Sequence, residues 1–194
     1  LRVDGRDIDV AAPFVRLSVS QAFVRFAGFD IVQGLTQSTL RPLLAQQGIH
    51  CGDDDSWDDL YHRAFLQLVE PQLARFAQPV FLTHFPAPLC SLAQMVPDDP
   101  QLSERFELLV GGVELANGFG ELTDAAVLRE RFVAAQHCRS ALGKHNYPLD
   151  ENFLLALQGL PEAAGIALGL DRLLMMLQGA ADMDEVSALP WEHT

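Results

Sequence analysis

The sequence predicts an α+β fold in which an antiparallel sheet is joined to a block of helices. Three observations support this prediction. Two apolar runs, 106–110 and 113–119, flank Gly111-Gly112, a dipeptide that suits a two-residue hairpin turn with positive φ. In 165–169, small residues alternate with apolar ones, as in a strand that another molecule can approach closely. Earlier in the chain, an acidic block at about 36–76 has helical patterning.

Capping residues and helix-breaking residues predict the bounds of the first helices. Ser18 or Ser20 can cap a helix that reaches about Ala27, where a glycine follows. A second helix is expected over about 39–47 and should stop at the next glycine. Pro42 is acceptable only in the first turn of that helix, because proline removes a backbone donor from the helix interior.

A third helix is expected after Ser56-Trp-Asp-Asp59. This tetrapeptide resembles a capping box in which Asp replaces the usual Glu or Gln. Four large apolar or aromatic residues then follow at helical spacing and should line one buried face: Tyr61, Phe65, Val69 and Leu73. We expect the helices of about 36–76 to form an insertion that covers the sheet.

The second half of the chain alternates strands with helices. A short strand is expected at 80–83. Thr123 or Asp124 should cap a long helix that ends before Gly143, and another helix is expected over about 150–157. The long helix should bury one stripe of residues: Leu128, Phe132, Ala135, Cys138 and Leu142.

The strand around 165–169 has one face with almost no side chains. By the two-residue period of a strand, this face carries Gly165, Ala167 and Gly169, so a flat ligand could lie against it. We expect the intervening apolar residues to point into the core: Ile166, Leu168 and Leu170. The alternative is a buried strand whose glycines serve packing alone.

Composition places the chain among globular proteins. Its 194 residues suit one domain, and a hydrophobic content of 49% excludes general disorder. The apolar runs are shorter than the ~20 residues that a membrane helix needs, and no basic-then-apolar leader opens the chain. The three cysteines show no paired spacing, as expected in a reducing compartment. We therefore expect a cytoplasmic protein that does not enter a membrane.

The net charge of −13 bears on the partners of the protein. An acidic surface repels phosphate backbones, because Lys and Arg supply the non-specific affinity for nucleic acids. Binding of tRNA by this chain alone is therefore not expected. The same surface could steer a basic protein patch that presents a lysine. The local run Asp53-Asp54-Asp55 is interpreted as a solvated helix start.

Two carboxylates in the hairpin are candidate metal ligands. Glu107 and Glu114 lie one on each strand and can share a face if Val110 and Val113 are paired across the turn. Magnesium takes one or two carboxylates together with phosphate oxygens, so this pair could present a metal to a nucleotide. The alternative is an exposed hairpin whose acidic residues face solvent.

Asn117 and Glu121 form a second candidate site. Glu121 lies in a stretch poor in charge, and a partly buried carboxylate needs a cationic partner. The ammonium group of a lysine-like substrate would be such a partner, while Asn117 offers a hydrogen bond. The alternative is a structural Glu121 paired with Arg129 or Arg131.

Arg172 follows the small-residue strand at the start of a helix, where a guanidinium suits a phosphate or a stacked purine. The six histidines show no zinc-type spacing, and neither a Gly-x-Ser-x-Gly elbow nor a Walker loop is present.

The run Gly165-Ile-Ala-Leu-Gly-Leu-Asp-Arg172 resembles motif 3 of class II aminoacyl-tRNA synthetases, and 104–122 is similar to the lysine-site hairpin of the lysyl-tRNA synthetase branch. His84-Phe-Pro-Ala87, Ser91-Leu-Ala-Gln94 and Ala167, where lysyl-tRNA synthetases usually have Gly, resemble the short paralogues that attach (R)-β-lysine to elongation factor P. The resemblance covers about 13–187 and implies that 1–194 is the C-terminal part of a class II catalytic domain.

The resemblance also implies roles for individual residues. ATP and Mg²⁺ are the expected cofactors, and Arg172 is the expected catalytic residue. The metal would be held by Glu107 and Glu114, and ATP by Glu114, Leu115, Gly169 and Arg172. The amino acid, lysine or (R)-β-lysine, would be bound by Asn117, Glu121 and Ala167.

Three functions remain open at this point. The favoured one is an ATP-dependent ligase that activates a lysine-type amino acid as an adenylate and passes it to a lysine of elongation factor P. The second is the catalytic domain of a lysyl-tRNA synthetase, with tRNA-Lys as acceptor. The third is a non-catalytic, synthetase-like binding domain. Motifs 1 and 2 of the class are not found before Pro13, so we expect a longer, homodimeric parent protein and an inactive isolated chain.

Overall fold

The computed structural model describes residues 1–3 and 5–188, which form the α+β fold that the sequence predicts. The strands are β1 (Arg2–Val3), β2 (Arg6–Asp7), β3 (Val15–Ser18), β4 (Val80–Pro86), β5 (Met95–Val96), β6 (Asp99–Val110), β7 (Val113–Gly120) and β8 (Ala164–Leu168). A six-stranded sheet has the order β3-β4-β6-β7-β8, with β5 paired to β6, and β1-β2 form a separate hairpin. Only β3 and β4 are parallel among the described pairs, so the sheet is mainly antiparallel.

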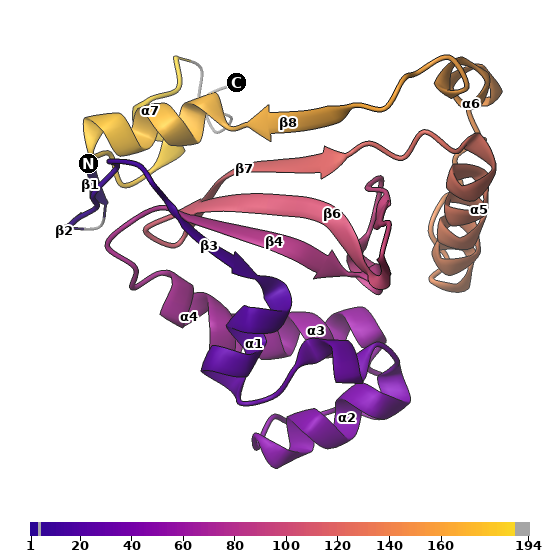
Figure 1. Ribbon diagram of the computed structural model, residues 1–194, viewed down its shortest axis with the longest axis horizontal. Helices are drawn as coiled ribbons and strands as arrows, with labels where there is room; N and C mark the ends of the chain where they lie inside the picture. Colours follow the sequence, from indigo (N-terminus) through magenta and orange to yellow (C-terminus); the bar gives the residue numbers. More distant parts are fainter. Residues whose placement is uncertain (4, 189–194) are drawn as a thin grey trace.

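The helices lie in three groups around the sheet (Figure 1). The first group follows β3, the second follows β7, and α7 lies beside β1. Their bounds are α1 (Val19–Ala27), η1 (Ile31–Gly34), α2 (Gln37–Gln46), α3 (Trp57–Ala64), η2, a π-helical turn (Phe65–Val69), α4 (Glu70–Leu73), η3 (Ala87–Leu89), α5 (Ala125–Ala141), α6 (Glu151–Leu157), α7 (Leu170–Gln178) and η4 (Met183–Glu185). None of the helices in the described residues has the length and hydrophobicity of a membrane-spanning segment.

Two of the predicted helix starts, those of α1 and α3, have capping boxes in the structure. Ser18 caps α1 together with Gln21, and Ser56 caps α3 together with Asp59. The Asp59 carboxylate accepts the hydrogen bond from the Ser56 backbone N–H that Glu usually accepts in a capping box. The expectation for Pro42 was wrong. Thr36 and Thr39 cap each other, so α2 starts at Gln37, two residues earlier than predicted, and Pro42 lies in its second turn.

The main core lies between α1–α4 and one face of the sheet. Phe23 of α1, Leu60 of α3 and Leu82 of β4 are fully buried there. Of the predicted face of the third helix, Tyr61, Val69 and Leu73 are buried and Phe65 packs against them. Burying a side chain of this size contributes about 1.5 to 3 kcal/mol, so this core fixes the helical block on the sheet. The candidate site lies on and beside β6, β7 and β8, next to this core.

The stripe predicted for α5 was mostly wrong. Leu128 is buried and Phe132 half-buried, but the other three predicted members are exposed: Ala135, Cys138 and Leu142. The reason is that the apolar packing of α5 is mainly with α6, in a small cluster with Leu154 and Leu157. This pair of helices stands at one end of the sheet (Figure 1), so the second half of α5 has little to pack against in the described structure.

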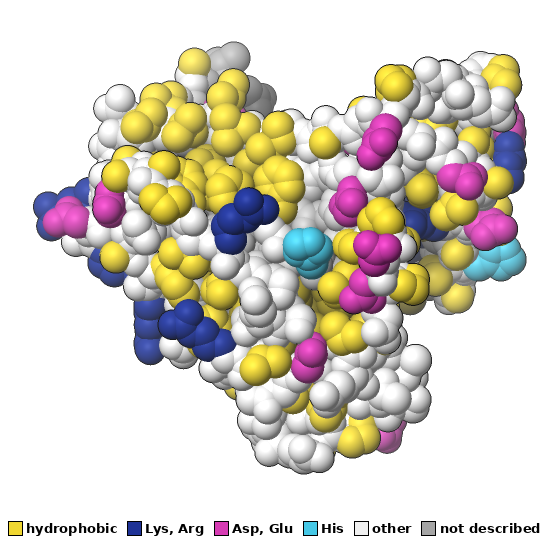
Figure 2. Space-filling model, in the orientation of Figure 1, with side chains coloured by type: hydrophobic (Ala, Val, Ile, Leu, Met, Phe, Trp, Pro, Cys, Tyr) yellow, Lys and Arg dark blue, Asp and Glu magenta, His cyan; other side chains and the backbone are white. Residues whose placement is uncertain are grey.

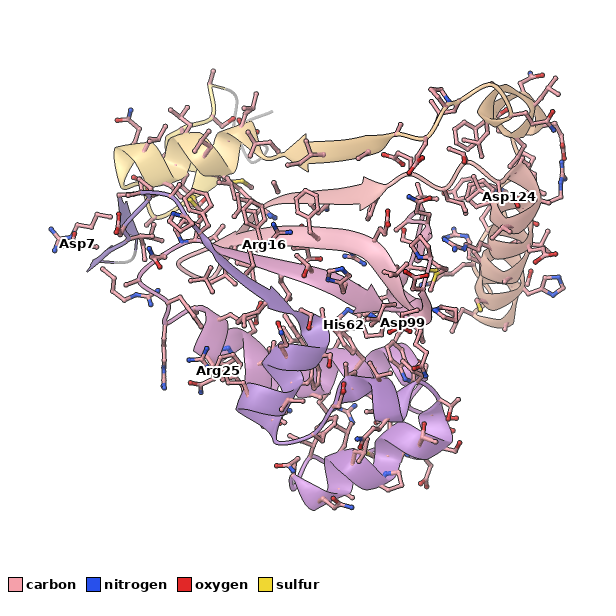
Figure 3. The ribbon with its side chains drawn as sticks, in the orientation of Figure 1. Asp7, Arg16, Arg25, His62, Asp99 and Asp124 are labelled. Carbon is pink, nitrogen blue, oxygen red and sulfur yellow. The ribbon has the colours of Figure 1, made fainter. Side chains whose placement is uncertain are left out.

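The prediction that β8 buries its apolar side chains was also wrong. Ile166 and Leu168 of β8 are 62% and 44% exposed, and Leu170, the first residue of α7, is 69% exposed. The physical reason is that no element of the described structure covers these side chains, and β8, the last strand of the described sheet, pairs only with β7. Figure 2 shows hydrophobic side chains gathered on this side of the molecule, over α7 and the neighbouring sheet, with Arg16 projecting from the sheet face in Figure 3.

Candidate functional site

The β6–β7 hairpin carries most of the candidate residues. Val110 pairs with Val113 as predicted, and both turn residues are left-handed, with φ of 61° at Gly111 and 97° at Gly112. A side chain at either position would be strained, which explains the Gly-Gly sequence. With this pairing, Glu107 and Glu114 lie on the same face of the hairpin.

A β-bulge in this hairpin sets which residues share that face. Leu109 pairs with Glu114, but Leu108 pairs with Ala116, so Leu115 is an extra residue on β7. In a regular strand, residues three apart lie on opposite faces. The bulge instead turns Asn117 to the face of Glu114, and the Asn117 Nδ2 donates a hydrogen bond to Glu114 Oε1 at 3.2 Å.

The bulge thereby joins the two predicted sites. Asn117 pairs directly with Glu107 across the hairpin. The Glu121 carboxylate lies against Gly165, which pairs with Phe119, so it is on the same face. Sequence reasoning missed the bulge. A signal was available, because the odd spacing between Glu114 and Asn117 cannot place both side chains in one site on a regular strand.

Glu107 is the more buried of the two candidate metal ligands. Its side chain is 15% exposed and Oε1 accepts a hydrogen bond from Arg105 Nη2 at 2.6 Å. Burial is the main cause that raises the pKa of Glu107, the Glu114 charge raises it further, and Arg105 opposes both. His62, labelled in Figure 3 where α3 meets the sheet, also favours the ionised form. Burial therefore acts against the ionised form of the Glu107 carboxyl more strongly than its charged neighbours favour it.

This donor set fits a hard divalent cation. Arg105 and Asn117 each engage one oxygen, Oε1, of Glu107 and of Glu114, so among the described residues the second oxygen of each carboxylate accepts no hydrogen bond. Two carboxylate oxygens are the protein contribution that Mg²⁺ commonly takes when phosphates supply other ligands. The described residues hold no cluster of three or more His, Cys, Asp or Glu that would form an all-protein metal cage.

Glu114, Leu115, Gly169 and Arg172, the four residues expected to bind ATP, lie together. Arg172 Nη1 donates to the Glu114 carbonyl at 2.6 Å and lies 3.8 Å from its carboxylate. The Gly169 amide donates to the Leu115 carbonyl at 2.9 Å, which ties the start of α7 to the bulge. The Arg172 side chain is 45% exposed, so its guanidinium is available to an anionic or planar ligand.

The residues expected to bind the amino acid also share one face. Ala167 pairs with Asn117 across β7 and β8, and Gly165 pairs with Phe119. The Glu121 carboxylate lies over Gly165, where a Cβ would come within 2.3 Å of Oε1. Gly165 therefore leaves the space that the carboxylate fills.

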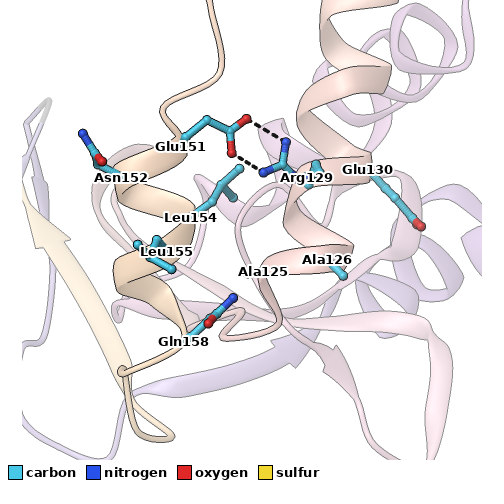
Figure 4. A pocket seen from close by; sticks show the side chains of 9 residues that line it. All are labelled: Ala125, Ala126, Arg129, Glu130, Glu151, Asn152, Leu154, Leu155 and Gln158. Carbon is cyan, nitrogen blue, oxygen red and sulfur yellow. Dashed lines mark hydrogen bonds and ion pairs between the residues drawn. The ribbon is translucent and has the colours of Figure 1, made fainter.

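The alternative partners of Glu121 are engaged elsewhere. Arg129 forms a two-pronged ion pair with Glu151 at the edge of a groove of about 570 Å³ between α5 and α6 (Figure 4). Arg131 donates to the carbonyls of Ser91 and Ala93. The interpretation of Glu121 as the partner of either arginine is therefore wrong, and no salt bridge to Glu121 is present within the described residues.

Two buried polar side chains next to this face were not singled out from the sequence. Arg105 lies two residues before Glu107, and Tyr61 comes from α3. The Tyr61 hydroxyl and the Arg105 Nε are both buried without a hydrogen-bond partner in the described residues. Burial raises the pKa of Tyr61 strongly, so this phenol stays neutral. The two-residue spacing to Glu107 was the available signal for Arg105.

Comparisons with known proteins identify the family of the chain. The family model "tRNA synthetases class II (D, K and N)" matches residues 2–193. Among curated relatives, "Elongation factor P--(R)-beta-lysine ligase" of Proteus mirabilis is 41% identical over 177 residues, 90% of this chain and 54% of that protein. The proteins of the same name from Pectobacterium atrosepticum and Klebsiella pneumoniae are 42% and 40% identical, over 91% of this chain and 55% and 54% of their own lengths. The chain thus spans about half the length of these relatives.

Proposed function

Because this chain belongs to the class II tRNA synthetase family of the D, K and N type, we propose that it is the C-terminal part of the catalytic domain of an ATP-dependent ligase. The ligase activates a lysine-type amino acid as an adenylate and transfers it to a lysine of elongation factor P, the acceptor in the names of the relatives. The observation that carries the proposal is the bulged hairpin, which gathers Glu107, Glu114, Asn117 and Glu121 on one face.

The nucleotide end of the site is assigned to the hairpin and the start of α7. Enzymes of this family generally use ATP and Mg²⁺, and a bound Mg²⁺ neutralises phosphate charge. Glu107 and Glu114 would hold the metal with their second oxygens. Arg172 is the expected catalytic residue, because its exposed guanidinium lies beside Glu114 where it can stabilise charge on the phosphate. Gly169 and Leu115, joined by a backbone hydrogen bond, would bring the main chain close to the nucleotide.

The amino-acid end is assigned to β7 and β8. The Glu121 carboxylate would pair with the side-chain ammonium of the substrate, and Asn117 would hold its head group. Ala167, opposite Asn117, would narrow the space beside the substrate and favour (R)-β-lysine over lysine. In this arrangement the protein aligns the substrate carboxylate with the α-phosphate, and the carboxylate oxygen displaces pyrophosphate.

A lysyl-tRNA synthetase domain with tRNA-Lys as acceptor, and a non-catalytic synthetase-like domain, are the competing functions. The net charge of −13 favours a basic protein acceptor over tRNA. We further propose a homodimeric, cytoplasmic parent and an inactive isolated chain. Within residues 1–194, the helical insertion would be 36–76, the active-site hairpin 104–121 and motif 3 165–178.

The test is ATP–pyrophosphate exchange by the full-length parent with lysine and (R)-β-lysine. Glu114→Gln should lower the exchange rate, because the loss of one metal-binding carboxylate oxygen removes about several kcal/mol of transition-state stabilisation. Glu130→Gln, an exposed carboxylate on α5, is the matched control and should leave exchange unchanged. Undiminished exchange in Glu114→Gln would refute the metal assignment. Acyl transfer to purified elongation factor P, and not to tRNA-Lys, distinguishes the ligase from the synthetase.

A further inference from the structure

Arg105 is fixed from several directions beside the proposed metal site. It precedes Glu107 by two residues on β6, so both side chains lie on one face of the strand. Its Nη2 donates to Glu107 Oε1 at 2.6 Å, and its Nη1 donates to the Leu89 carbonyl at 3.1 Å. The guanidinium carbon lies 4.4 Å from the ring centre of Phe85 and 6.0 Å from that of Phe119.

This environment holds the guanidinium more tightly than an ordinary surface ion pair would. The side chain of Arg105 is 20% exposed, and its Nε is buried without a partner in the described residues. The planar group is held between a backbone carbonyl, an aromatic face and a carboxylate, which are the contacts that distinguish Arg from Lys. A surface pair with free rotamers would contribute little and would fix no geometry.

The consequence falls on the orientation of Glu107. Arg105 occupies Oε1 and fixes the plane of the carboxylate, while Oε2 accepts no hydrogen bond from the described residues. Metal ligands are oriented by partners of this kind, and removing such a partner typically lowers metal affinity or activity 10- to 100-fold.

We propose that Arg105 is a positioning residue that orients the Glu107 carboxylate toward the divalent cation of the nucleotide site. This inference rests on the proposed function, since it requires Glu107 to be a metal ligand. Arg105 acts through Glu107 and touches neither nucleotide nor amino acid in this assignment.

The experiment is calorimetric titration of the full-length parent with ATP in the presence of Mn²⁺, which substitutes for Mg²⁺. Arg105→Gln should weaken binding of Mn²⁺·ATP about 10- to 100-fold. Arg105→Lys keeps the charge without the planar fork, so it should fold and recover only part of the affinity. The matched control is Arg129→Gln, whose guanidinium pairs with Glu151 away from the site, and it should bind as the wild type does.

A double-mutant cycle separates positioning from general damage. In a Glu107→Gln background, Arg105→Gln should cause no further loss of Mn²⁺·ATP affinity, because the two residues act as one unit. Equal additional loss in that background would overturn the inference. Wild-type affinity in both Arg105 variants, with affinity lost in Glu107→Gln, would overturn the inference and leave the proposed function standing. Wild-type affinity in Glu107→Gln would overturn both.

Discussion

Replacing Gly165 with Ala should disable amino-acid recognition without disturbing the fold. A Cβ at this position would lie 2.3 Å from Glu121 Oε1, whereas ordinary contacts begin at 3.4 Å. The carboxylate must therefore move by about 1.1 Å, which a flexible side chain can do. A displacement of about 1 Å from productive geometry can cost 10²-fold in rate, equivalent to about 2.7 kcal/mol.

The assay is steady-state pyrophosphate exchange by the full-length parent, with lysine, (R)-β-lysine and ATP varied separately. We expect kcat/KM for the amino acid to fall about 10²-fold in Gly165→Ala, while the KM for ATP and the melting temperature change little. Gly159→Ala is the matched control. A Cβ there meets only the Ala156 carbonyl at 3.5 Å, so this variant should behave as the wild type does.

Two results would refute the reasoning. Unchanged kinetics in Gly165→Ala would mean that the Glu121 carboxylate does not bind the substrate ammonium. A parallel loss for ATP and for the amino acid, with a lowered melting temperature, would mean that Gly165 serves packing of β8 alone.

Three further predictions concern the specificity pocket, the main core and the Glu107 carboxyl. Ala167→Gly should relax the preference for (R)-β-lysine over lysine by about 1 to 3 kcal/mol, measured as the ratio of exchange rates, and an unchanged ratio would remove Ala167 from the specificity pocket. Leu82→Ala should lower the free energy of unfolding by about 2 to 5 kcal/mol in urea titrations, because Leu82 is fully buried between β4 and α1–α4. Glu107→Gln should become more stable relative to the wild type as the pH rises from 4 to 7 without divalent cations. The raised pKa of Glu107 means that the unfolded chain ionises first, so the wild type loses stability as the pH rises through this range, and a constant difference between the two proteins would contradict the assignment.

Features that depend on a few neighbouring residues were predictable from the sequence. The Gly111-Gly112 turn and the capping residues Ser18 and Ser56 lie where the sequence places them, because positive φ and side-chain caps are local requirements. The predicted start of α2 was two residues late because the cap at Thr36, which bonds reciprocally with Thr39, was not identified from the sequence.

Features that depend on distant contacts were not predictable in the same way. The sequence of β8 has the alternation of a half-buried strand, but burial also requires a covering element, and Ile166 remains exposed in the described structure. The same holds for the second half of α5. In the candidate site, the candidate residues came from the sequence, whereas their common face depends on the bulge at Leu115, for which the odd spacing between Glu114 and Asn117 was the available signal.

The extra residue at Leu115 makes the length of this hairpin a determinant of its chemistry. Deleting it would restore a regular two-residue period, and Asn117 and Glu121 would then turn away from Glu107 toward the opposite side of the sheet. A gap of one residue at this position therefore moves the side chains of β7 beyond Glu114 to the opposite face of the sheet, whereas a change of two residues leaves them on their own face. Relatives should tolerate substitutions within β7 far better than single insertions or deletions.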